Sequence, residues 1–91
     1  MKVSIDIGDF KRSHRGLIHV LETIDKAGGT MSTRNLLQAM NNWGAHGHSM
    51  IKRAEEQGYI KRKEGRREHG HFAPMYNILT SKGKRLLEQL Q

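Results

Sequence analysis

The stretch from Leu36 to Ile60, LLQAMNNWGAHGHSMIKRAEEQGYI, constrains the fold of this chain most. Its apolar residues recur at helical spacing on both sides of residues 41–44, which are Asn, Asn, Trp and Gly. Asn and Gly tolerate the backbone angles of a turn, so this tetrapeptide should separate two helices. The second helix is predicted over about 45–57, and Gly58 is expected to end it. The pattern therefore predicts two short helices joined by a tight turn.

A longer amphipathic helix is predicted before this pair. Its apolar stripe consists of Phe10, His14, Leu17, Leu21 and Ile24. Asp9 is the expected N-cap, and Gly28-Gly29 are expected to end the helix in left-handed conformation. Since His14 lies on the stripe, we interpret it as a half-buried core residue rather than a ligand.

Residues 1–9 have a different periodicity. Val3, Ile5 and Ile7 alternate with polar residues, which is typical of a strand. This strand would add to a sheet edge or pair with a second subunit, or the segment would form a loosely held arm.

The helix before the turn follows a two-residue extended link at Thr30-Met31. Ser32 or Thr33 is expected to cap it, and it should end near Met40. The only tryptophan, Trp43, falls in the turn. We expect it to fill the junction between the two helices, with stacking on a base or sugar as the alternative.

Two strands are predicted after Gly58, over residues 59–63 and 75–79, joined by a long loop that contains the only proline. The loop is too long for a tight hairpin, so its tip should be mobile unless something binds it. Thr80 or Ser81 is expected to cap a last helix over about 81–90, whose apolar side is Leu86, Leu87 and Leu90.

Composition argues against an enzyme. The 91 residues suffice for one domain, and a hydrophobic content of 35% with 5% aromatic residues leaves little volume for a deep cavity. The absence of cysteine excludes disulfides, thiolate metal sites and cysteine nucleophiles. The acids are scattered, and no phosphate-binding glycine loop or nucleophile elbow occurs. We therefore expect no catalytic residues and no cofactor.

The charge of the chain indicates a polyanionic partner. Sixteen Lys and Arg against nine Asp and Glu give a net charge of +7. Binding to a polyanion would release condensed counterions, which favours association. No apolar run approaches the roughly 20 residues that span a bilayer, and the N-terminus lacks a signal-peptide pattern. We expect a cytoplasmic, nucleoid-associated protein without membrane contact.

Two motifs carry a resemblance to known regulators. RAEEQGYIKR resembles a pattern of an apolar residue, two acids, a further residue, Gly, two apolar residues and basic ones. YNILTSKGKRLL is similar to a strand that leaves a wing, with Leu-Thr and a following Lys-Gly. Together they make residues 12–90 resemble the winged helix-turn-helix of the MarR and PadR families of transcription regulators.

The resemblance implies a mainly α fold with a small β-hairpin wing (α+β): a three-helix core plus a C-terminal helix. The domain would span residues 10–91, preceded by the arm at 1–9. Its recognition helix would be about 45–57, its wing about 59–79 and its C-terminal helix about 81–90. The chain lacks the long terminal helices through which MarR proteins dimerise and line a ligand pocket, so the resemblance does not extend to that dimer or to small-molecule sensing.

A recognition helix in the major groove presents its outward side chains, near its N-terminus, to base edges. The basic residues after it would hold phosphates or enter a minor groove. The residues expected to contact DNA are Arg34, His46, His48, Ser49, Lys52, Arg53, Lys61, Lys63, Arg66 and Arg67. Among them, Arg53 is best suited to bidentate contact with guanine. Strand alternation sends Arg62 to the face opposite Lys61 and Lys63.

Six histidines include two His-Gly-His pairs, at 46–48 and 69–71. Neutral imidazoles are ligands for zinc, nickel or copper, so His46, His48, His69 and His71 are candidate metal ligands. However, side chains two residues apart on a helix point to nearly opposite sides. We therefore favour contacts to DNA for the first pair and predict no metal site.

These observations predict a double-stranded DNA-binding protein, a transcriptional regulator or an architectural binder of the nucleoid. The alternative is a winged helix that binds RNA or protein within a larger assembly. One module of this size buries little DNA surface, so a homodimer is expected. Its contacts would come from the last helix (Leu87, Leu90) or from the N-terminal strand (Val3, Ile5, Ile7).

Overall fold

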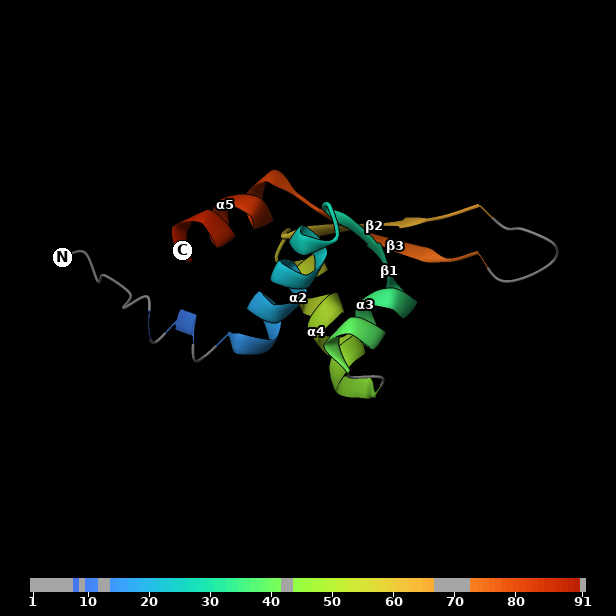
Figure 1. Cartoon of the computed structure of the whole chain (residues 1–91), viewed down its shortest axis with the longest axis horizontal. Coiled ribbons are helices and arrows are strands. Elements are labelled where there is room, and N and C mark those ends of the chain that lie inside the picture. Colours follow the sequence, from blue (N-terminus) through green and yellow to red (C-terminus); the bar gives the residue numbers. More distant parts are fainter. Residues whose placement is uncertain (1–7, 9, 12–13, 42–43, 67–72, 91) are drawn as a thin grey trace.

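The computed structural model describes residues 8, 10–11, 14–41, 44–66 and 73–90. Its elements, in chain order, are α2 (Arg15–Lys26), β1 (Thr30–Ser32), α3 (Thr33–Met40), α4 (Ala45–Glu56), β2 (Ile60–Glu64), β3 (Met75–Leu79) and α5 (Ser81–Leu90). The strands form an antiparallel sheet in the order β1-β3-β2. The hairpin of β2 and β3 extends away from the helices as a wing, as Figure 1 shows.

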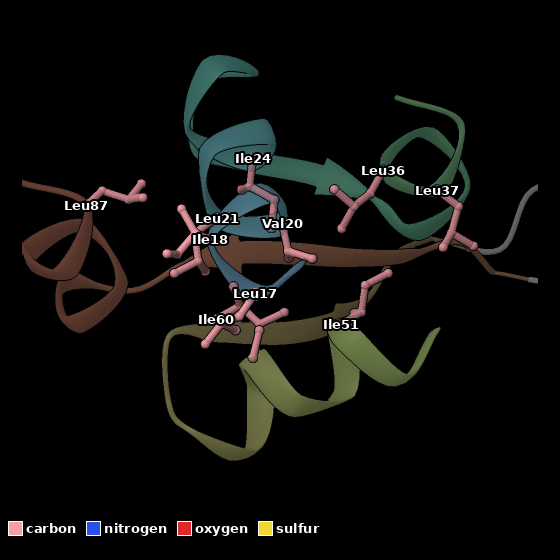
Figure 2. Packing of buried hydrophobic residues seen from close by; sticks show 11 residues of the cluster. Leu17, Ile18, Val20, Leu21, Ile24, Leu36, Leu37, Ile51, Ile60 and Leu87 are labelled. Carbon is pink, nitrogen blue, oxygen red and sulfur yellow. The ribbon is translucent and has the colours of Figure 1, made fainter. Parts of the chain in front are cut away.

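The core lies where α2 packs between the other helices and the sheet. Leu21, Ile24 and Leu36 have an exposed fraction of 0%, and Ile51 of α4 has 1%. Figure 2 shows these side chains with Ile60 from β2 and Leu87 from α5, so α2, α3, α4, α5 and β2 contribute to one cluster. Of the apolar stripe predicted for the first helix, Leu17, Leu21 and Ile24 are thus confirmed as core residues, whereas Phe10 and His14 are half-buried.

The start of this helix differs from the prediction. A continuous helix from Asp9 was expected, whereas α2 begins at Arg15 and its N-cap, His14, has non-helical angles (φ −118°, ψ 27°). The His14 ring stacks on Phe10 with centroids 4.2 Å apart, and its Nδ1 lies 3.1 Å from the Phe10 carbonyl oxygen. The imidazole thus shares the carbonyl that the backbone N–H of His14 also uses. His14 is half-buried, as predicted, and Asp9 lies outside the described residues.

The helix ends as predicted. Gly28 and Gly29 have φ values of 98° and 96°, which side chains with a Cβ disfavour. The Gly29 carbonyl then accepts a hydrogen bond from the Leu79 N–H (2.8 Å), which ties this turn to the end of β3.

The predicted extended link at Thr30-Met31 is instead part of a third strand. In β1, Met31 is opposite Asn77 and Ser32 is opposite Tyr76. β3 pairs with β2 along one edge, and the short extended segment β1 pairs along the other edge. Ser32 then caps α3, since its Oγ accepts from the Asn35 N–H at 3.2 Å. The predicted N-terminal strand (Val3, Ile5, Ile7) lies outside the described residues, and Gly8 has helical backbone.

The Leu-Thr and Lys-Gly motif forms the junction between the sheet and α5. The Thr80 hydroxyl accepts from the Gly83 N–H (3.1 Å) and donates to the Gly58 carbonyl (2.7 Å). Thr80, rather than Ser81, is therefore the cap. A Cβ at Gly83 would collide with the Tyr59 carbonyl oxygen, so only glycine lets α5 approach this backbone so closely.

Candidate nucleic-acid interface

Helix α4 buries one side and exposes the other. Gly47, Ile51 and Ala54 are buried, as the sequence predicted. The side chains expected to face DNA are all exposed: His46, His48, Ser49, Lys52 and Arg53. The first turn of α4 contains no acidic residue, and its N-cap, Gly44, has no side chain to occupy the N–H groups there. This end of the helix is therefore electrostatically suited to an anion.

The exposed residues of α4 do not all point the same way. At about 100° per residue, Ser49 points most directly away from the buried line, and Lys52 and Arg53 lie about 50° to either side of that direction. Arg53 lies in the last turn and borders a cavity of about 240 Å³ that is also lined by residues of the first helical region, including His14 and Leu17. Arg53 thus lies on the flank nearest α2, and its predicted base contact remains a prediction.

Arg34 is exposed at the second position of α3, immediately after the end of β1. In Figure 1 this end of α3 lies beside the base of the wing. Its predicted contact with the DNA backbone remains a prediction.

The described part of the wing exposes three of the predicted cations. Lys61 and Lys63 are exposed on one face of β2, opposite Ile78 and Tyr76 of β3. Arg66 is exposed just beyond β2, where the Gly65 N–H donates to the Pro74 carbonyl. Residues 67–72, which include Arg67 and part of the loop whose tip was predicted to be mobile, lie outside the described residues.

Arg62 occupies the opposite face, as strand alternation predicted, and has partners that the sequence did not indicate. Its Nε donates to Asn77 Oδ1 (3.1 Å) and its Nη2 donates to Thr33 Oγ1 (3.2 Å). Asn77 is 0% exposed, and its Nδ2 donates to the Met31 carbonyl and to Thr33 Oγ1, both at 3.1 Å. We call Arg62, Asn77 and Thr33 the polar node.

An asparagine in the middle of a strand was the available signal for this cluster, because Asn is depleted in strands unless its amide has partners. The sequence alone could not name those partners. They come from β2 and from the junction of β1 with α3, which only the sheet register brings together.

The histidines and Trp43 are only partly accounted for. His46 and His48 are exposed on α4, whereas His69, His71 and Trp43 lie outside the described residues. Within the described ranges, no group of three or more His, Asp or Glu side chains is arranged to hold a metal ion.

The predicted dimer contact at Leu87 needs correction. Leu87 is only 5% exposed because it packs in the core of its own chain, so it cannot also cover a second subunit. Leu90 is half-buried and packs against the same core.

Among the helices that the structure describes, none is long and apolar enough to cross a bilayer.

Comparison with solved structures supports the fold. The chain is similar to the YusO protein from Bacillus subtilis (TM-score 0.69, 19% identity), covering 82% of this chain and 50% of that one. It is also similar to the organohalide-sensing transcriptional regulator RdhR in its 2,4-dichlorophenol-bound form (TM-score 0.70, 15% identity), covering 90% of this chain and 50% of that one. No family model and no curated protein matches the sequence.

These likenesses confirm the predicted fold class, an α+β winged helix-turn-helix. In the described residues it consists of α2 to α5 and a three-stranded antiparallel sheet, in which β1 adds to the predicted hairpin. The chain spans about half the length of each of the two solved structures. At this level of identity the comparison establishes the winged-helix fold alone, and it does not confirm the resemblance to the MarR or PadR families.

Proposed function

We propose that this protein binds double-stranded DNA and acts as a transcriptional regulator, with α4 in the major groove and the wing on the phosphate backbone or minor groove. The fold supports the proposal because the structural neighbours include a transcriptional regulator. It does not by itself specify the ligand. The distribution of charge is therefore the decisive observation.

That observation concerns α4 and the wing together. Over its first ten residues α4 carries Lys52 and Arg53 and no acid, and the acids Glu55 and Glu56 come only at its end. Beyond it, the wing exposes Lys61, Lys63 and Arg66 against Glu64. A cationic helix followed by a cationic hairpin has the charge and shape to follow a duplex.

Within this interface we assign different tasks to the two parts. Ser49 and Lys52, with His46 and His48 near the N-terminus, would reach base edges, while Arg53 would reach a base or phosphate from the flank of α4. Arg34 and the wing cations, including Arg67, would neutralise phosphates. Under this proposal, α4 determines the sequence preference and the wing supplies most of the salt-dependent affinity.

The test is a measurement of duplex binding by fluorescence anisotropy, using duplexes selected from a random pool. Lys52→Ala should weaken binding to the selected duplex, by about 1–3 kcal/mol if the Lys52 side chain contacts a base. Lys84→Ala, which removes an exposed lysine of α5, is the matched control and should leave affinity unchanged. Equal losses in the two variants would contradict the assignment of α4.

The wing is tested by salt dependence. Lys61→Ala combined with Lys63→Ala should reduce the slope of log affinity against log salt by about 0.9 for each lost phosphate contact. The loss of affinity should be similar for all duplex sequences. Wild-type affinity for duplex DNA no better than for single-stranded RNA would instead favour a winged helix that binds RNA or protein.

We further propose that the cytoplasmic protein binds DNA as a homodimer, because a single module of this kind buries only roughly 600–1,000 Å². Since Leu87 is committed to the core, the candidate contacts are Leu90 and the segment of Val3, Ile5 and Ile7. Sedimentation velocity at micromolar concentration should show a species of twice 10.4 kDa. A monomer both free and on DNA would contradict the dimer without affecting DNA binding.

A further inference from the structure

We propose that Arg62 is a positioning residue, which fixes the direction of the wing relative to α3 and does not contact DNA. The inference rests on the proposed function only for its effect on DNA binding. Its structural part, a fixed angle between wing and helix, follows from the polar node and can be tested without DNA.

In the polar node, every polar side-chain atom of Thr33 and Asn77 has a hydrogen-bond partner. The Thr33 hydroxyl accepts from Asn77 Nδ2 and Arg62 Nη2 and donates to the Met75 carbonyl (3.2 Å), which uses its one proton and both lone pairs. The Asn77 amide donates twice and accepts once. The amide cannot be flipped without placing its nitrogen against the Arg62 donor. Only one arrangement of these groups satisfies all of them.

The node adds side-chain hydrogen bonds to the backbone pairing that joins these parts of the chain. Arg62 belongs to β2, Asn77 to β3, and Thr33 is the first residue of α3. The wing continues beyond this point only as the hairpin, since β1 ends at Ser32. The node therefore lies at the last position where the wing is attached to the helical body, and a small rotation there would displace the wing cations.

Arginine is suited to this task for a reason other than its charge. Two guanidinium nitrogens in a rigid plane reach Asn77 and Thr33 at once. Lysine offers donors from a single flexible point and cannot reproduce that fork. Arg62 is half-buried, whereas Lys61 and Lys63 on the opposite face are exposed, so the strand separates the positioning cation from the cations that we assign to phosphates.

The absence of cysteine provides a direct test, because spin labels can be attached at introduced cysteines alone. Gln38→Cys on α3 and Glu64→Cys on the wing are both exposed positions. Their distance distribution, measured by double electron–electron resonance, should be narrow in the parent protein and broader after Arg62→Lys. Lys63→Ala is the matched control and should leave the distribution narrow. An unchanged distribution in Arg62→Lys would overturn the proposal.

DNA binding supplies the second readout. If the untethered wing holds its binding orientation about one tenth of the time, Arg62→Lys should bind the selected duplex about tenfold more weakly. The salt slope should not change, because no phosphate contact is lost. A phosphate-contacting Arg62 would behave in the opposite way: Arg62→Lys would bind nearly normally, and Arg62→Gln would lower the slope by about 0.9.

A second pair of variants keeps the test decisive if Arg62→Lys does not fold, which loss of cooperative thermal unfolding would reveal. Thr33→Val removes the hydroxyl and should broaden the distribution, whereas Thr33→Ser retains it and should restore a narrow one. Broad distributions in both variants would contradict the role of the node. Failure of the parent protein to bind any duplex would refute the proposed function, while the distance measurements would still decide the positioning role.

Discussion

The helical core and the base of the wing are both buried, but opposite kinds of interaction hold them. Leu21, Ile24 and Leu36 are 0% exposed and surrounded by other apolar groups. Asn77 is equally buried, yet every polar atom of its side chain is hydrogen-bonded. Apolar contacts are non-directional and contribute stability in proportion to area, whereas hydrogen bonds contribute little net stability but fix geometry. The core thus determines whether the protein folds, and the polar node determines how the wing is oriented.

The largest expected effect breaks the apolar side of this comparison. Leu21→Ala should lower the free energy of unfolding by about 2–5 kcal/mol, because it leaves a cavity at the centre of the cluster. Urea denaturation measures the loss. Gln38→Ala, at an exposed position of α3, is the control and should change stability by less than about 0.5 kcal/mol.

The next effect breaks the polar side. Asn77→Ala should cost about 2–3 kcal/mol, since it leaves the Arg62 donor and the Met31 carbonyl without the partners they have now. Replacing both partners, in Arg62→Met with Asn77→Leu, should cost less than the single change, because fewer buried polar groups then lack partners. A double variant less stable than Asn77→Ala would mean that the node is a major source of stability.

A smaller effect concerns the junction of the sheet with α5. Gly83→Ala should destabilise the protein by about 1–3 kcal/mol, because its Cβ would meet the Tyr59 carbonyl oxygen. Thermal unfolding would show a lower midpoint. Gly44→Ala is the matched control, because a Cβ at this position would meet open space. An equal loss of stability in Gly44→Ala would mean that the close approach of α5 is not the cause of the effect at Gly83.

The smallest effect is the loss of a helix cap. Thr80→Ala should cost about 1 kcal/mol, since its hydroxyl accepts from the Gly83 N–H and donates to the Gly58 carbonyl. Ser81→Ala should be nearly neutral, because Thr80 is the cap. Reversed magnitudes in chemical denaturation would return the cap to Ser81.

Most of the helical architecture was predictable because its signals are local. The stripe of Leu17, Leu21 and Ile24 repeats at helical spacing, and Gly28 and Gly58 mark helix ends by their backbone freedom. The buried line of α4 followed from the same periodicity. The break at His14 did not, since His14 falls on the same apolar stripe as the helix that follows it.

The candidate interface was predictable to the extent that exposure follows periodicity. Ser49, Lys52, Lys61 and Lys63 are exposed as expected. The flank position of Arg53 was not predictable, because it depends on how α2 packs against α4. The same holds for Thr33, whose role in the polar node requires strands from distant parts of the sequence.

The strand order β1-β3-β2 also has a consequence for how the chain folds. The contact between Arg62 and Asn77 closes a separation of 15 residues, whereas that between Met31 and Asn77 closes one of 46. Loop entropy makes the longer closure costlier by about 1 kcal/mol. We therefore expect the hairpin to form early and β1 to dock late, so that the hydrogen bonds from the hairpin to Met31 and Thr33 are among the last to form during folding and the first to open during unfolding.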